Sequence, residues 1–173
     1  MFWGVSDPFR PSSPRPFPSQ WYNESLVKKV QLITDGACLG NPGKGGWAAI
    51  LRFGDKQKEI YGCEAHTTNN RMELKAAIEG LRTLREECEV EVITDSEYMK
   101  NGITSWIANW KKKGWLTAAK KPVVNRDLWE ELDFQNQRHR TVWSWTKGHA
   151  SHEDNNRADE LASMAAREQR SQS

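Results

Sequence analysis

Four acidic residues stand where carboxylates could take part in catalysis, two at strand ends and two near helix starts. Asp35 and Asp95 each end a strand-like segment, and active-site residues of open α/β sheets cluster at strand ends. Glu73 opens a helix-like segment, and Asp159 lies in the first turns of another. Each also has a structural explanation, because a carboxylate complements a helix dipole and an aspartate before Gly or Ser forms turns. Taken singly, the four residues leave both interpretations open.

The segments that carry these residues predict one mixed sheet with helices packed against it. Apolar alternation and turn residues predict strands at residues 30–35, 47–52, 57–63, 89–94 and 141–145. A glycine-rich loop is expected at 36–46, and a hairpin turn at 53–56. Helical spacing predicts helices within 67–88, 96–101 and 103–113, and around 128–132 and 158–165. Cys88 is expected to end the first helix, and Gly102 to separate the two short ones.

Length and composition exclude several classes of protein. A chain of 173 residues, 37% of them hydrophobic, fits one domain with a sizeable core that needs no disulfides. No apolar run approaches the roughly 20 residues that span a bilayer, so a transmembrane protein is not expected. The cysteines are Cys38, Cys63 and Cys88, an odd number without close spacing. They predict reduced thiols in a cytosol-like compartment, and no four-cysteine zinc site.

The two ends of the chain differ from its middle. Prolines crowd the start, so residues 1–27 are expected to form a flexible, polyproline-like tail. Residues 28–168 would form the folded domain, and residues 169–173 a frayed C-terminus. The tail lacks the apolar core of a secretory signal and the amphipathic helix of a mitochondrial one. Docking of a partner through its aromatic residues stays open; these are Phe2, Trp3, Phe9 and Phe17.

Six short motifs are weak singly but specific together. They are Ile33–Gly36, Gly40–Gly43 with Gly45–Gly46, Thr67–Leu74, Thr94–Ser96, Lys147–His149 and Asp159–Ala162. In this order and spacing they resemble type 1 ribonuclease H in its bacterial form, over about residues 28–166. The resemblance implies an α/β, ribonuclease H-like fold: a mixed five-stranded sheet flanked by helices, with a basic protrusion.

The resemblance further implies that Asp35, Glu73, Asp95 and Asp159 meet as four catalytic, metal-binding carboxylates. Clustered carboxylates repel one another until cations neutralise them, and hard oxygen ligands suit Mg²⁺ or Mn²⁺. Two such ions about 4 Å apart can hold the attacking water and the leaving oxygen of a phosphodiester. The implied activity is a metal-dependent endonuclease that cleaves the RNA strand of RNA–DNA hybrids. Its products would carry 5′-phosphate and 3′-hydroxyl ends.

His149 lies in a loop-like segment before the last helix. The resemblance gives it a catalytic role in proton transfer or product release, which suits a side chain that titrates near neutral pH. Taken alone, the segment around His149 indicates a histidine in a surface loop. A zinc pair with His152 is a further alternative, although no cysteine stands at a suitable spacing.

A basic and aromatic segment predicts a contact with nucleic acid. Residues 106–126 contain six basic residues and no acidic one. Lysines neutralise phosphates and aromatic rings pack on sugars or bases; the residues concerned are Trp106, Trp110, Trp115, Lys111, Lys112 and Lys113. By the resemblance, Trp106 and Trp110 would pack against deoxyribose. A solvated helix face is the plainer interpretation of the lysines alone.

The resemblance also implies contacts to each strand of the hybrid. Asn41, Asn69 and Asn70 would meet the RNA strand in the minor groove. There an amide can both donate to and accept from a 2′-hydroxyl. Thr68 and Asn125 would grip a phosphate of the DNA strand. As a structural alternative, the asparagines could form turns or cap a helix.

Three positions depart from the bacterial pattern. His66 replaces a common phosphate-pocket arginine, Glu97 replaces a glutamine near the RNA strand, and Asn156 replaces an acid ahead of Asp159. These changes leave the metal site intact and bear on affinity, sequence preference and pH optimum. Two alternatives stay open: a hybrid-binding module without catalysis, and the nuclease domain of a retroelement polyprotein. The expected partner is an RNA–DNA hybrid, with no membrane contact, a monomeric chain and a cytoplasmic location.

Overall fold

Five strands form a single mixed sheet in the computed structural model, which describes residues 8–9, 26–145 and 152–172. The strands are β1 (Lys28–Leu39), β2 (Gly43–Phe53), β3 (Lys56–Thr67), β4 (Cys88–Thr94) and β5 (Arg140–Trp145). Their order across the sheet is β3-β2-β1-β4-β5. β2 pairs antiparallel with both β1 and β3, whereas β4 pairs parallel with β1 and β5 parallel with β4. The predicted mixed five-stranded sheet is confirmed.

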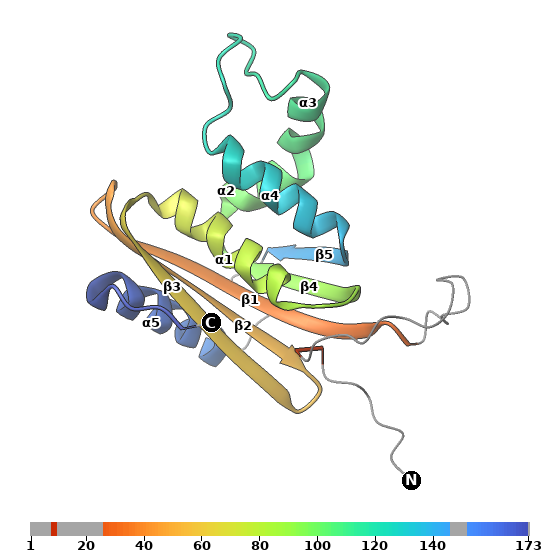
Figure 1. Ribbon diagram of the computed structural model, residues 1–173, viewed down its shortest axis with the longest axis vertical. Coiled ribbons are helices and arrows are strands. Elements are labelled where there is room, and N and C mark those ends of the chain that lie inside the picture. The colour runs from red at the N-terminus through yellow and green to blue at the C-terminus, as the bar shows by residue number, and fades with distance from the viewer. Residues whose placement is uncertain (1–7, 10–25, 146–151, 173) are drawn as a thin grey trace.

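Helices flank this sheet on both faces (Figure 1). They are α1 (Asn69–Thr83), α2 (Glu97–Asn101), the π-helical segment η3 (Gly102–Trp106), α3 (Ile107–Lys112), α4 (Arg126–Gln137) and α5 (His152–Glu168). Helix α1 packs on one face of β1 and β2, and α5 packs on the other face. Helix α4 packs against α1. None of the helices described is long and apolar enough to cross a membrane.

The central strand β1 carries apolar side chains on both faces. Leu32 belongs to the core cluster with α1, whereas Ile33 packs with Ile50, Ile93 and Ala158. These side chains are at most 2% exposed. Successive side chains of a strand point to opposite faces. The neighbouring pair Leu32 and Ile33 therefore helps to anchor a helix on each side of β1.

Strands β1 and β2 extend into both ends of segment 36–46, so the predicted glycine-rich loop is confirmed only at residues 40–42 and is wrong for the rest. β1 does not end at Asp35 but runs to Leu39, and Asp35 pairs with Ala48 in the ladder with β2. Within β2, a Cβ on Gly46 would fall 2.2 Å from the carbonyl oxygen of Ala162. This glycine therefore permits the close approach of α5 and does not form a turn.

Two predicted helix boundaries are also wrong. α1 ends at Thr83, and Cys88 begins β4. Cys88 fits the apolar spacing of the helix because it remains fully buried after the helix has ended. Gly102 does not stop a helix but begins η3, which joins α2 to α3. A Cβ on Gly102 would meet the Trp129 ring at 1.9 Å, so packing against α4 explains this glycine.

Both ends of the described chain contact the sheet. Phe9 packs against the core, with Lys58 Nζ 5.8 Å from its ring centroid. Gln172 pairs with Tyr61 of β3 through two backbone hydrogen bonds of 2.8 Å, so the prediction of a frayed C-terminus is wrong at this residue. Most of residues 1–27 lie outside the described part, and the flexible tail stays a prediction.

Candidate active site

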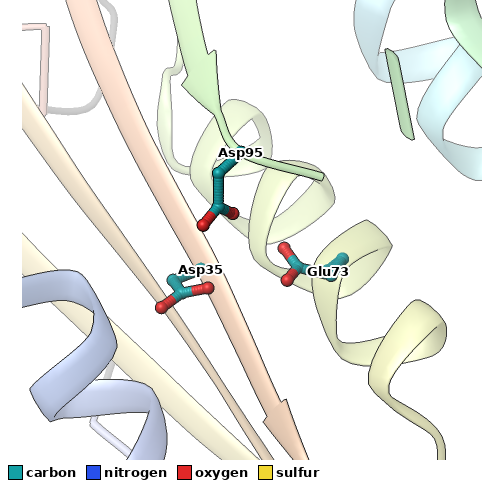
Figure 2. A group of neighbouring side chains, drawn as sticks. All are labelled: Asp35, Glu73 and Asp95. Carbon is teal, nitrogen blue, oxygen red and sulfur yellow. The ribbon is translucent and has the colours of Figure 1, made fainter. Parts of the chain in front are cut away.

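Three carboxylates from three different elements converge beside the central strand (Figure 2). Asp35 lies within β1, Asp95 directly follows β4, and Glu73 lies in the first turns of α1. One oxygen from each side chain lies within 4.8 Å of the other two. The parallel pairing of β1 with β4 brings the two aspartates to the same region of the sheet. The topology thus unites residues that are far apart in the sequence.

Hydrogen bonds of the surrounding backbone support this arrangement. The Gly36 amide donates to Asp35 Oδ1 at 2.9 Å. Thr68 is the N-cap residue of α1 and so defines where the helix of Glu73 begins. Beyond β4, Trp145 Nε1 donates to the backbone carbonyl of Asp95 at 3.2 Å. The strand, the helix and the loop that present the carboxylates are each held by a local contact.

Burial and mutual repulsion act on the clustered carboxylates. Glu73 is 5% exposed, and its burial, followed by the charges of Asp35 and Asp95, raises its pKa well above the ordinary value. Burial also raises the pKa of Asp35 from 3.8 to about 7, and the charges of Asp95 and Asp159 add to this effect. Without a cation the site favours protonated carboxyl groups, and a bound cation reverses that preference.

One oxygen of the cluster lacks a hydrogen-bond partner in the part of the chain that the structure describes. Glu73 Oε2 is buried and forms no hydrogen bond among the described residues. A buried polar atom without a partner is costly, and a carboxylate oxygen in this state suits a hard cation. The three side chains offer oxygen atoms only, which favours Mg²⁺ or Mn²⁺ over softer metals. The site therefore fits the ions that the sequence predicts.

The remaining two predicted catalytic residues are placed differently. Asp159 is exposed on α5 and lies outside the three-carboxylate group, although it is near enough to raise the pKa of Asp35. His149 lies outside the described residues, as does the side chain of His152. Proton transfer by His149 and the alternative zinc pair therefore both stay predictions.

The predicted RNA-contacting asparagines lie on the β1–β2 turn and on the first turn of α1, which are joined to each other. Asn41 Oδ1 accepts a hydrogen bond from the Asn69 amide at 3.2 Å, which ties the β1–β2 turn to the start of α1. Asn69 and Asn70 are the first residues of α1 and do not cap it. All three side chains are exposed. They therefore form one polar surface at the end of the helix that carries Glu73.

The segment from η3 to the start of α4 forms a protrusion that stands away from the sheet (Figure 1). This protrusion carries a row of aromatic rings. The ring centroids of Trp106 and Trp110 are 5.7 Å apart, and those of Trp110 and Trp115 are 6.2 Å apart. All three side chains are half-buried. The row packs inward against Trp129 of α4, since its ring lies 5.6 Å from that of Trp110. The rings are thus held in place and still reach the surface.

The three consecutive lysines of the protrusion differ in their surroundings. Lys111 forms an ion pair with Asp133 of α4 at 2.9 Å. Lys112 and Lys113 are exposed at the end of α3, where a positive charge complements the helix dipole. Only part of the predicted lysine run is therefore free of an acidic partner among the described residues.

Comparison with known proteins assigns the family. A model of the RNase H family matches residues 27–167. The chain belongs to the ribonuclease H family. It is 73% identical over 143 residues to a ribonuclease H of Solibacter usitatus, a match that covers 83% of this chain and 98% of the relative. It is 57% identical over 141 residues to the ribonuclease HI of Neisseria meningitidis, with 82% and 97% covered.

A solved ribonuclease H structure agrees with this assignment. LC9-RNase H1, a type 1 enzyme with the type 2 active-site motif, is 31% identical to this chain and superposes with a TM-score of 0.75. The match covers 84% of this chain and 75% of the other. The resemblance to bacterial type 1 ribonuclease H is therefore confirmed.

This ribonuclease H also contains polar contacts that the sequence did not indicate. Arg71 Nη1 donates to Asn125 Oδ1 at 3.3 Å, and Arg71 Nη2 pairs with Asp127 at 2.7 Å. Asn125 and Trp129 both donate to the hydroxyl of Tyr98. Arg71 lies inside one of the six motifs, and this position was the only sequence feature that could have indicated a role for it. For Tyr98, only its closeness in sequence to Asp95 could have drawn attention.

The three departures from the bacterial ribonuclease H pattern are all exposed side chains: His66, Glu97 and Asn156. Glu97 is the first residue of α2, where a carboxylate complements the helix dipole. This gives Glu97 a structural role that does not require contact with RNA. His66 lies two residues before Thr68, on the side of the molecule where α1 begins.

Proposed function

We propose that this chain hydrolyses the RNA strand of RNA–DNA hybrids as an endonuclease and leaves 5′-phosphate and 3′-hydroxyl ends. Its membership of the ribonuclease H family supports this activity. The observation that carries the proposal is the convergence of Asp35, Glu73 and Asp95 within 4.8 Å. Such a cluster is costly to fold, because burial and repulsion oppose ionisation of Glu73. A module that only binds hybrids would not need it.

The four carboxylates Asp35, Glu73, Asp95 and Asp159 would hold two Mg²⁺ ions, for which Mn²⁺ could substitute. When bound, these ions activate water and stabilise the charge on the leaving 3′ oxygen. Glu73 is buried and so provides a fixed ligand, whereas Asp95 and Asp159 are exposed and can adjust as the substrate binds. His149 would move a proton during cleavage or help the product to leave.

The RNA strand would be recognised by its 2′-hydroxyls. The amide groups of Asn41, Asn69 and Asn70 can donate and accept at the same time, as a hydroxyl does. The hydrogen bond between Asn41 and Asn69 supports this assignment, since it holds the β1–β2 turn at a fixed separation from the start of α1. Asn69 and Asn70 precede Glu73 on the same helix, so a recognised ribose would lie close to the carboxylates.

The DNA strand would meet the protrusion and the start of α1. Thr68 Oγ1 accepts from the Arg71 amide at 3.3 Å, which leaves its hydroxyl hydrogen to donate to a phosphate together with Asn125. The tryptophan row would pack against deoxyribose, where a 2′-hydroxyl would crowd the rings. Lys112, Lys113 and Lys111 would neutralise nearby phosphates.

A reducing compartment and a monomeric chain complete the proposal. Cys38, Cys63 and Cys88 are free thiols, which is typical of cytoplasmic proteins. We therefore place the reaction in the cytoplasm. A single chain carries all the carboxylates of the proposed site, so catalysis would not require a second copy.

The reaction can be tested with one labelled RNA strand. The strand would be paired with DNA, paired with RNA or left single, each with Mg²⁺, with Mn²⁺ and with EDTA. We expect cleavage of the hybrid alone, only with metal, and products whose 5′ ends are removed by a phosphate-dependent exonuclease. Hybrid binding without cleavage would instead identify a binding module. Cleavage in EDTA would contradict the metal assignment.

A further inference from the structure

Tyr98 lies at the junction of the two parts of the proposed DNA-binding surface. It belongs to α2, and its ring is 5.7 Å from that of Trp106 and 5.2 Å from that of Trp129, between centroids. Its hydroxyl accepts a hydrogen bond from Asn125 Nδ2 at 3.1 Å and another from Trp129 Nε1 at 2.9 Å. The side chain is half-buried. Tyr98 thus connects the tryptophan row to Asn125.

The Tyr98 hydroxyl accepts two hydrogen bonds and keeps one hydrogen to donate. Amide and indole nitrogens only donate, so both contacts use the two acceptor positions of the phenol oxygen. The hydroxyl hydrogen of Tyr98 remains as a donor. Among the residues that the structure describes, none accepts it. Two donated bonds also polarise the O–H group and make it a stronger donor.

Asn125 is held from both ends of its carboxamide. Its backbone has a φ of 62°, in the left-handed region, and its side chain does not cap α4. Nδ2 donates to Tyr98, and Oδ1 accepts from Arg71. Arg71 in turn pairs with Asp127, which balances its charge. Asn125 therefore has one defined orientation, which is set by Tyr98 and Arg71.

The charge around this group explains why a neutral donor matters here. Arg71 is neutralised by Asp127, and an imidazole, His66, stands where an arginine is common. A phosphate at Thr68 and Asn125 would therefore depend on hydroxyl and amide donors. Neutral donors of this kind make many of the contacts by which proteins hold a nucleic-acid backbone.

We propose that Tyr98 is a further DNA-strand-binding residue of this protein: its hydroxyl orients Asn125 and donates its remaining hydrogen to the phosphate that Asn125 and Thr68 hold. The inference rests on the proposed function, because it assumes that a hybrid binds. Through its ring contact with Trp106, the same side chain sets the phosphate contact and the deoxyribose contact relative to each other.

Tyr98→Phe tests this role, because it removes the hydroxyl and keeps the ring. We expect KM for the hybrid to rise about tenfold or more with little change in kcat, since one hydrogen bond to a charged group is lost. Tyr61→Phe is the matched control. The Tyr61 hydroxyl contacts Gln172 and Arg170 in the cluster beside α5, on the other face of the sheet. An unchanged KM in Tyr98→Phe would overturn the inference.

A modified substrate separates phosphate binding from a general loss of structure. Hybrids would carry one uncharged methylphosphonate linkage at successive positions of the DNA strand. At the linkage that the Tyr98 hydroxyl contacts, the methylphosphonate should lower the affinity of wild type for the hybrid. It should lower the affinity of Tyr98→Phe clearly less, because that variant already lacks the hydroxyl. Equal losses in both proteins at every position would overturn the inference. Absence of cleavage by wild type would overturn the proposed function itself.

A spectroscopic measurement covers the case in which Tyr98→Phe does not fold. Trp129 Nε1 donates to Tyr98, so its indole N–H resonance reports on that hydroxyl. In Asp35→Asn protein saturated with hybrid, this resonance should shift with an unmodified DNA strand. It should shift less when the critical linkage is a methylphosphonate. The same shift with both hybrids would overturn the inference.

Discussion

Gly36 of β1 lies against the backbone of Glu73 in α1, so closely that a Cβ on the glycine would be 2.5 Å from the Glu73 nitrogen. No side chain fits between the two, and the strand and the helix can therefore approach until their carboxylates share one site. The amide of the same glycine donates to Asp35 Oδ1 at 2.9 Å. One residue without a side chain thus controls the positions of two clustered carboxylates.

Gly36→Ala should separate Glu73 from Asp35. Cleavage should fall by about 100-fold, because a displacement of about 1 Å has effects of that size. Single-turnover cleavage would measure this loss, and urea unfolding should show a cost of roughly 1–3 kcal/mol from overpacking. The control is Gly80→Ala in α1, the helix that carries Glu73. The new Cβ would meet the Leu32 side chain at 2.5 Å, away from the carboxylates. Normal cleavage by Gly36→Ala would contradict the packing argument.

Asp35→Asn should abolish cleavage and keep hybrid binding. The change removes a proposed metal ligand and a negative charge together, so electrostatic repulsion of the substrate does not increase. We expect cleavage to fall far more than about tenfold, while the Kd measured in EDTA stays the same or decreases. Asp55→Asn, at the exposed hairpin between β2 and β3, is the control. Activity within about tenfold of wild type would refute the metal assignment.

The protrusion should contribute to binding through Lys112 and Lys113 more than through Lys111. Lys111 is engaged with Asp133, whereas the other two are exposed. Replacing Lys112 and Lys113 with alanine should raise KM more than it lowers kcat. It should also flatten the plot of log Kd against log salt by about one to two, because roughly 0.9 counterions are released per phosphate contact. Lys111→Ala is the comparison, and equal salt slopes in all three proteins would contradict the prediction.

His66→Arg should strengthen binding of the DNA strand. A guanidinium keeps its charge at every working pH and binds phosphate by two hydrogen bonds, whereas an imidazole does neither. KM should fall about threefold or more at low salt, with kcat unchanged. His66→Gln, which places a neutral amide at the same exposed position, is the control. If His66→Arg and His66→Gln gave the same KM, position 66 would not contact phosphate.

Local apolar patterns predicted the five strands, whereas the convergence of Asp35, Glu73 and Asp95 was implied by the resemblance to type 1 ribonuclease H. Alternating apolar residues mark β1, and apolar residues at helical spacing mark α1. The sequence did not predict the full length of β1 and β2, because glycine residues occur both in turns and at positions of close packing. Gly46 is in a strand because α5 lies against it, and Gly102 is in a helical segment because Trp129 lies against it. Only the tertiary structure contains that information.

The candidate site shows the same division between local and long-range information. Asp35, Glu73 and Asp95 lie within three of the six motifs, so the resemblance to the family was enough to group them. The network of Arg71, Tyr98 and Asn125 joins three separate segments and has no local pattern. The prediction that Cys88 ends a helix was wrong for a related reason. Cys88 fits the apolar spacing of the helix but begins β4, and it is buried there. A buried residue satisfies either periodicity.

His139 should make the stability of the protein depend on pH near neutrality. It is 7% exposed, and Nδ1 accepts a hydrogen bond from the Cys88 amide at 3.2 Å, which requires the neutral ring. Burial, followed by the charge of Arg138, lowers the pKa of His139 below its ordinary value of 6.5. As the pH falls, the unfolded chain therefore takes up the proton first.

The stabilisation from the neutral His139 ring is therefore complete above pH 6.5 and is lost as the pH falls toward the folded pKa. Urea unfolding should show a loss of about 1 kcal/mol for each pH unit in that interval. His139→Gln should be less stable at pH 7.5 and should lose less on acidification. His66→Gln, at an exposed histidine, should keep the wild-type dependence. If His139→Gln and wild type lost the same free energy between pH 7.5 and pH 5.5, another group would be responsible.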